Sequence, residues 1–141
     1  MSIATIREAL ATQIEAVSGV SYAPDIMPTK IPNDKLAAVT VYFAGFKQDR
    51  MNTGGSLTDN TWRFRVDIYI AAQNQSNAIA TLETIISGIL TSFRANSNLS
   101  NTVDFVNVVD GGDPDLLMSG EGNSIPLLFK TLSIEVRTEE G

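Results

Sequence analysis

Thr61–Ala72, with the sequence TWRFRVDIYIAA, decides the fold. Its large apolar residues occupy every second position, and they are Trp62, Phe64, Val66, Ile68 and Ile70. Successive side chains of a β-strand point to opposite faces, so this pattern predicts a strand in a sheet with one buried face. We expect Trp62 to belong to the core rather than to an interface. At about 3.3 Å per residue, the strand would cross the whole body of a domain of this size.

A second strand is expected at Leu36–Phe46, where Val39, Val41 and Phe43 share one face. The two strands are separated by Lys47–Asn60, whose sequence KQDRMNTGGSLTDN is polar and contains two adjacent glycines. Ordinary hairpins close with about 2–5 residues, and much longer unstructured connections usually bind something. The sequence therefore predicts a polar arm at 47–60 that is held out from a rigid sheet.

Two amphipathic helices are expected to pack on this sheet. The first has apolar residues at steps of three and four between Ile3 and Val17, with Ser2 as its N-cap and Gly19 beyond its last turn.

The second helix is expected at Asn77–Arg94, with Ser76 as its N-cap. Gly88 lies inside it, at some cost in helix propensity, and would permit close approach to the sheet. The expected apolar face consists of Ile79, Leu82, Ile86, Ile89, Leu90 and Phe93.

The rest of the chain completes an α+β pattern. Ser21–Lys35 has a proline at every fourth position, which forbids helix and central strand and indicates an extended connector or a second arm. Further strands are expected at Val103–Val109 and Leu127–Thr138, with a turn-rich segment at Asp110–Ser124 between them. The order α-β-β-α-β-β predicts one domain over residues 1–141. We expect a mostly antiparallel four-stranded sheet packed by two helices, with a long loop between the first two strands.

The composition limits the chemistry that the chain can perform. It contains no cysteine and no histidine, which removes thiol nucleophiles, disulfides and imidazole acid–base groups. The segment Asp110–Asp115, DGGDPD, lacks oxygen ligands at the positions that a calcium loop requires and is typical of a turn. We therefore predict no enzymatic activity, no catalytic residue, no metal site and no cofactor.

The charge and the hydropathy bear on possible partners. A net charge of −6 argues against tight DNA binding, because surfaces that bind nucleic acid are normally basic. No apolar run approaches the roughly 20 residues that cross a bilayer, so we expect no membrane contact. Lys47, Arg50, Arg63 and Arg65 cluster around the arm and the second strand. They either keep a long strand soluble and blunt its edge, or contact an acidic neighbour.

Several segments follow one another in the order found in a known family. They are a helix, IREALATQIEAV, a proline-broken connector, YAPDIMPTKIP, a long hairpin, a second helix, NAIATLETIISGILTSFR, and closing strands that end in LLFKTLSIEVRT. This layout resembles the tail terminator (tail completion) proteins of bacteriophages with long non-contractile tails. The resemblance covers the whole chain and contains no sharp motif. Similar layouts occur in neck and head–tail connector proteins.

The resemblance implies a homo-hexameric ring that caps the tail tube, stops its polymerisation and offers a face to the head–tail connector. DNA would pass through the lumen without specific binding, and the protein would assemble in the host cytoplasm and reside in the virion. The residues expected to contact a sister subunit or the tail are Lys47, Gln48, Arg50, Met51, Asn52, Arg63 and Arg65. Open alternatives are another neck or tube component, a small-ligand-binding α+β domain with the loop as a lid, and a carboxylate-based hydrolase.

Overall fold

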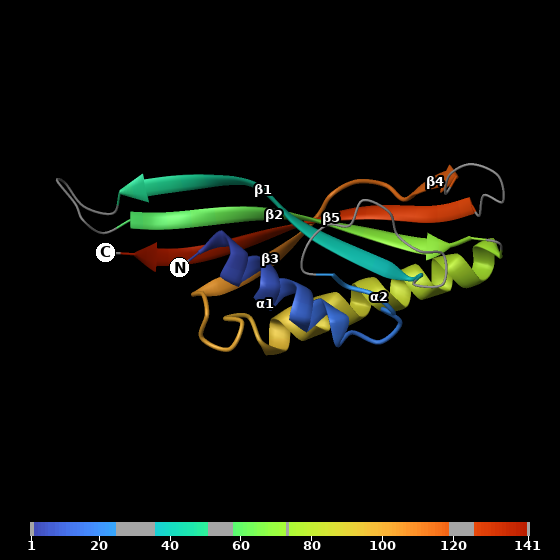
Figure 1. The fold of residues 1–141 in the computed structure, drawn as a ribbon, viewed down its shortest axis with the longest axis horizontal. Coiled ribbons are helices and arrows are strands. Elements are labelled where there is room, and N and C mark those ends of the chain that lie inside the picture. Colours follow the sequence, from blue (N-terminus) through green and yellow to red (C-terminus); the bar gives the residue numbers. More distant parts are fainter. Residues whose placement is uncertain (1, 25–35, 51–57, 73, 119–125, 141) are drawn as a thin grey trace.

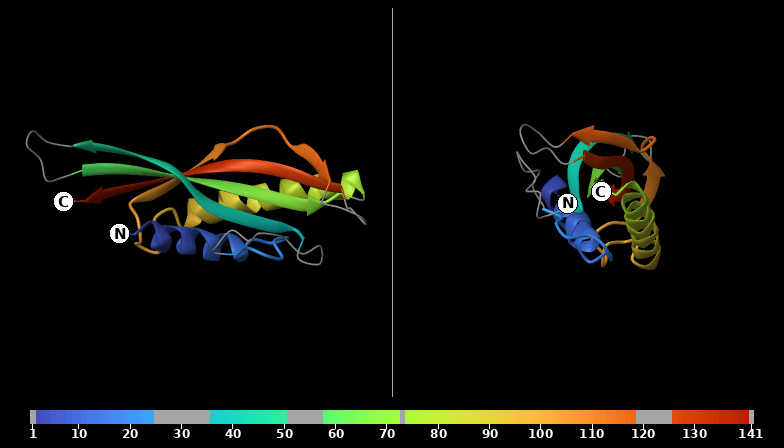
Figure 2. Two further views of the ribbon diagram at one scale, coloured as in Figure 1. Left: turned by 45° about the horizontal axis from the view of Figure 1, so that its top comes forward. Right: turned by 90° about the vertical axis from the view of Figure 1, so that its right-hand side faces the viewer.

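Two helices pack against one face of a twisted antiparallel sheet in the computed structural model, which describes residues 2–24, 36–50, 58–72, 74–118 and 126–140 (Figure 1). The fold is α+β, as the sequence predicts. The end-on view in Figure 2 shows the sheet curving over both helices. The elements are α1 (Ile3–Glu15), β1 (Ala38–Arg50), β2 (Thr58–Ala71), α2 (Gln75–Ala95), β3 (Phe105–Asp110), β4 (Asp115–Met118) and β5 (Pro126–Glu140).

Within the described residues the sheet has five strands instead of the predicted four. Its order is β1-β2-β5-β3, and β4 pairs with the other half of β5. β5 is long enough to hold both β3 and β4 along one edge, with register pairs from Phe105↔Arg137 to Met118↔Pro126. β4 has only four residues, too few for an alternating pattern to be recognised in a segment rich in turn residues.

The core lies between the helices and the face of the sheet that they cover, which we call the inner face. The apolar row of β2 predicted from the sequence is on this face, and Phe64, Val66 and Ile68 are fully buried. Full burial of such side chains stabilises the fold by about 1.5–3 kcal/mol each. On α1, Ser2 is the N-cap, as predicted, because its Oγ accepts a hydrogen bond of 3.1 Å from the Thr5 amide.

The buried face of α2 differs from the predicted one. Ile79 and Leu90, which were expected in the core, are 49% and 42% exposed. The buried positions are Ala78, Leu82, Ile85, Ile89 and Phe93. The helix carries more apolar residues than one face can bury, so periodicity alone does not select the buried stripe. The N-cap is Asn74, whose side chain accepts from the Asn77 amide, and not Ser76.

Two further expectations for α2 need correction. A Cβ at Gly88 would lie 2.6 Å from Cγ1 of Val17, so this glycine permits close approach to the segment after α1 and not to the sheet. Ser76–Ala95 is long and apolar enough to cross a membrane by length and composition, contrary to the expectation that no such run exists. Core helices pass the same test, and one face of α2 packs on the sheet here.

The predicted arm at 47–60 is wrong over much of its length. β1 and β2 remain paired from Lys47↔Thr61 to Arg50↔Thr58, so these residues form a ladder and not a loop. Residues 46–50 of β1 are exposed on both faces, and a strand in that position tolerates polar residues throughout, so its alternating signal disappears. Residues 51–57 of the predicted arm lie outside the described part, as do residues 25–35 of the predicted connector. The preceding Tyr22 forms a parallel bridge with Ala38 at the start of β1.

Candidate interaction surfaces

A three-stranded ladder of β1, β2 and β5 continues beyond the N-terminal end of α1 (Figures 1 and 2). Its last register pairs join Arg50 to Thr58 and Thr58 to Glu140. We call the part from Phe46 to Arg50, with the residues paired to it, the projecting ladder. Because three strands are paired there, the projection is a stiff element with its polar backbone groups largely satisfied.

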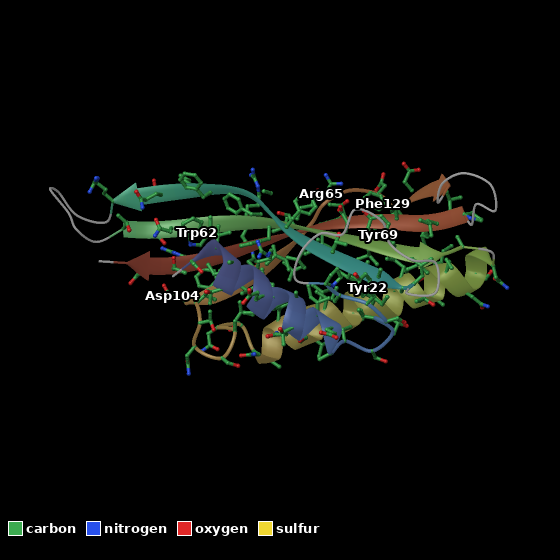
Figure 3. The ribbon with its side chains drawn as sticks, in the orientation of Figure 1. Tyr22, Trp62, Arg65, Tyr69, Asp104 and Phe129 are labelled. Carbon is green, nitrogen blue, oxygen red and sulfur yellow. The ribbon has the colours of Figure 1, made fainter. Side chains whose placement is uncertain are left out.

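Trp62 anchors the projecting ladder to the body (Figure 3). Its indole Nε1–H donates a hydrogen bond of 3.0 Å to Oγ1 of Thr138, and its ring packs against the core cluster. This position is in line with the core role predicted for Trp62. Phe46 lies beside it with ring centroids 5.9 Å apart, yet Phe46 is 68% exposed. An aromatic side chain so exposed on a rigid projection is typical of a contact residue.

An ion pair joins β2 to β5 in the projecting ladder. Arg137 on β5 donates to both carboxylate oxygens of Asp59 on β2, with Nε and Oδ1 2.6 Å apart. This hydrogen bonding raises the pKa of Arg137. The guanidinium also lies over the Phe105 ring, 5.7 Å from its centroid, which ties β3 to the same cluster. The end of β5 is fixed further by Asp104, which accepts from the Glu139 amide at 2.8 Å.

The structure separates the residues that the sequence grouped as one contact site. Lys47, Arg63 and Arg65 point to the face opposite the helices, which we call the outer face. Gln48 and Arg50 alternate to the inner face, because the register shifts by one residue between Phe43 and Gly45. The remaining two predicted contact residues, Met51 and Asn52, lie outside the described part of the chain.

A polar and aromatic cluster covers the outer face near the middle of the sheet (Figure 3). Asp67 is 2% exposed and accepts hydrogen bonds from Arg65 Nε at 2.8 Å and from Thr131 Oγ1 at 2.9 Å. The hydrogen bond to Asp67 raises the pKa of Arg65. Burial, and then the Asp67 charge, raise the pKa of Tyr42 and Tyr69. Asp67 was not singled out from the sequence, where it is one polar position in an alternating strand.

The helical side of the molecule carries an exposed apolar stripe on α2. It consists of Ile79, Ile86 and Leu90, of which Ile79 and Leu90 are exposed and Ile86 is partly buried. These residues lie at steps of seven and four, so they share one side of the helix. These residues are the apolar side chains of α2 that exceed what its buried face can hold, and they are the reason that the sequence pattern predicted the wrong buried face. That surplus was the signal from which an exposed contact surface could have been inferred.

A shallow groove of about 570 Å³ separates the two helices near the start of the 96–100 turn. Its lining is mostly small and apolar, with Ala9, Ala16, Ala95 and Leu99 among its residues. Gln13 bridges the helices across one end, donating to the Ser92 carbonyl at 3.0 Å and accepting from Asn96 at 2.9 Å. The groove therefore lies on the side of α2 that faces α1, away from the α2 stripe.

Comparisons with known proteins do not identify the chain. A scan against models of protein families gives no match, and a search of curated protein sequences gives none either.

Proposed function

We propose that this chain is a structural, non-enzymatic protein of a long-tailed bacteriophage that caps the tail tube as a ring. The proposal joins the resemblance in sequence layout to one structural observation, the ladder of β1, β2 and β5 that projects past the helices with Phe46 68% exposed. A stiff projection with an exposed aromatic residue is suited to reach a neighbouring molecule. In a ring of identical subunits each contact joins two different patches, and a projection of this kind can supply one of them.

The patch that best matches the projecting ladder is the exposed stripe on α2. Phe46 is aromatic, and Ile79 and Leu90 are aliphatic and exposed, so their contact would remove apolar surface from water on both sides. Burying one aromatic side chain in this way contributes about 1.5–3 kcal/mol. Lys47 and Arg50 would lie at the rim, where charged side chains set orientation more than affinity.

The proposed ring acts by its two unlike faces. One face binds the end of the tail tube and occupies the surface on which the next tube ring would assemble. The other face binds the head–tail connector protein, so that tube growth stops where the head attaches. Six copies, the number that the resemblance implies, would carry a strongly negative total charge, since each has a net charge of −6. DNA is itself a dense line of negative charge and would pass such a lumen without binding.

Tube growth in the presence of the purified chain tests the function. A terminator added at about one ring per growing tube shortens the tubes and appears only at their ends in electron micrographs. A tube component would instead appear along their length, and a different neck protein would leave tube growth unchanged. Either of these two results would overturn the assignment.

Two single variants test the contact between the projecting ladder and the α2 stripe. Phe46→Ser and Leu90→Ser should each abolish self-association, measured by sedimentation velocity. Since the two residues lie on opposite partners of each contact, an equimolar mixture of both variants can form one intact contact per pair. The mixture should therefore form dimers and no rings. Val109→Ser is the matched control, because Val109 is 39% exposed but lies outside the proposed contact. Rings formed by either variant alone would contradict this contact.

A further inference from the structure

The outer face contains a hollow of about 340 Å³ beside two arginines of β2, and it lies outside the contact proposed above. Arg63, Arg65, Thr131 and Ser133 contribute polar groups to its lining, together with Ala44 and Gly111. Side chains from β2 and β5 thus converge on one small open space, which the β1 bulge and the β3–β4 connection border.

Arg65 is fixed in this hollow by its neighbours. Its Nε donates to the buried carboxylate of Asp67, and its guanidinium carbon lies 5.6 Å from the centre of the Tyr42 ring. Asp67 uses the same oxygen to accept from Thr131. The Arg65 side chain is still 44% exposed, so part of its guanidinium faces solvent.

Arg63 is positioned by the bulge in β1. A Cβ at Gly45 would lie 2.9 Å from Nη2 of Arg63, so the guanidinium occupies the space that a side chain at Gly45 would fill. The register shift between Phe43 and Gly45 creates this space. Arg63 forms no ion pair within the described ranges. Glu135, which faces it across the β2–β5 register, instead lines a neighbouring hollow with Asn107 and Arg137.

The charges of the hollow select the ligand. Arg63 and Arg65 contribute two positive charges, which the buried Asp67 and the neighbouring Glu135 offset, so the hollow favours a ligand of low charge that fits the guanidinium geometry. A guanidinium donates a pair of parallel N–H groups that match the two oxygens of a carboxylate. A phosphate dianion or a duplex would bring more negative charge than the hollow neutralises, on a chain whose net charge is already −6.

We infer that this hollow is a binding site for a carboxylate side chain, a glutamate or aspartate presented by a partner protein. Arg63 is the main ligand-binding residue, and the exposed part of the Arg65 guanidinium completes the site. The inference goes beyond the ring proposal and does not depend on it, because the hollow lies outside the proposed contact between the projecting ladder and the α2 stripe.

Titration of the full chain with short peptides tests this site. The probe is the blocked peptide Gly-Glu-Gly, and Gly-Gln-Gly is its uncharged match. Observing the arginine Nε–H signals by NMR, we expect saturable shifts at Arg63 and Arg65 with a Kd of roughly 10–100 mM, as for one charge-assisted hydrogen-bonded pair in water. Equal shifts with both peptides, or tighter binding of inorganic phosphate than of Gly-Glu-Gly, would overturn the carboxylate assignment.

Two variants test separately whether binding of Gly-Glu-Gly needs the charge of Arg63 and whether it needs the position of its guanidinium. Arg63→Gln should weaken binding of Gly-Glu-Gly by about tenfold, whereas Arg94→Gln, an exposed arginine at the end of α2, should leave it unchanged. Gly45→Ala retains every charge but displaces the flexible end of Arg63, so it should weaken binding to a similar degree without unfolding the chain. Unchanged binding in either Arg63→Gln or Gly45→Ala would refute the site. If the natural chain binds Gly-Glu-Gly but forms no rings, only the ring proposal is refuted.

Discussion

At the residue scale, Gly88 decides how α2 packs against the end of α1. A methyl group there would lie 2.6 Å from Cγ1 of the buried Val17, too close for any real contact. Gly88→Ala gains about 1 kcal/mol of helix propensity, but overpacking of this kind costs about 1–3 kcal/mol. We expect a net loss of stability, measured as a lower urea midpoint with an unchanged m-value.

The partner residue gives this prediction its control. In a Val17→Ala background the methyl group at position 88 has space, so Gly88→Ala should become stabilising there. Ser87→Ala, an exposed neighbour in the same helix, should change stability by less than about 0.5 kcal/mol. The same sign for Gly88→Ala in both backgrounds would show that Val17 is not the cause.

Ser100 lies in a left-handed turn between α2 and β3. Leu99, Ser100 and Asn101 have φ values of 50°, 56° and 69°, a conformation that costs residues with a side chain roughly 1 kcal/mol each. Ser100→Gly removes that cost and loses only a 3.4 Å hydrogen bond from Asn96. We expect a gain of about 0.5–1 kcal/mol by thermal or urea unfolding. Ser97→Gly, in the same turn at a residue without positive φ, should destabilise instead; a gain for both variants would contradict the explanation.

At the scale of elements, the sequence predicts the central strand well and the ends of the hairpin poorly. The apolar row of β2 is buried where a helix layer covers it, so its alternation reports the fold directly. Beyond that layer residues 46–50 of β1 are exposed on both faces, although Asn60 and Thr138 on the neighbouring strands are buried. The polar residues from Lys47 to Arg50 therefore carry no pattern that separates a strand from a loop. β4 was missed for a different reason, because its strand has only four residues and lies at the edge of the sheet.

The candidate site depends on the register of β1 against β2, which cannot be read from the hydrophobic periodicity of the sequence. Without the bulge at Ala44, the alternation of β1 would place Arg50 on the outer face and Lys47 on the inner one. The shift between Phe43 and Gly45 exchanges these faces, so Lys47 joins Arg63 and Arg65. The clustering of Arg63 and Arg65 was predictable because two residues of one strand at a spacing of two always share a face. Their relation to Gly45 and Asp67 required the structure.

The connection from β3 to β4 is held by Lys130 on β5. This lysine is 6% exposed, and its Nζ donates to a carboxylate oxygen of Asp110 and to the Gly112 carbonyl. The hydrogen bond from Lys130, and then the one from the Gly112 amide, lower the pKa of Asp110. A lowered folded-state pKa means that the carboxylate contributes stability above its ordinary value of 3.8 and loses that contribution as pH falls through the folded value.

Asp110→Asn should therefore be less stable than the natural chain near neutral pH, and the difference should shrink as pH falls below 3.8. Thermal unfolding across the acid range measures this. The same substitution in a Lys130→Met background should have little effect, because the buried cation is gone. A stability difference that is equal at neutral and strongly acid pH would assign the effect to the turn and not to the ion pair.

At the scale of the whole molecule, net charge and apolar contact oppose each other in the proposed ring. Each chain carries −6, so the approach of two copies is repelled at low ionic strength. Salt shortens the Debye length to about 8 Å at physiological strength and leaves the burial of Phe46 against α2 intact. Raising the NaCl concentration should therefore strengthen self-association, measured by sedimentation equilibrium, while it weakens binding of Gly-Glu-Gly to the arginine hollow. Phe46→Ser should stay monomeric at every salt concentration. Self-association that declines with salt would mean that Lys47 and Arg50 hold the copies together through ion pairs, and the apolar contact would then have to be abandoned.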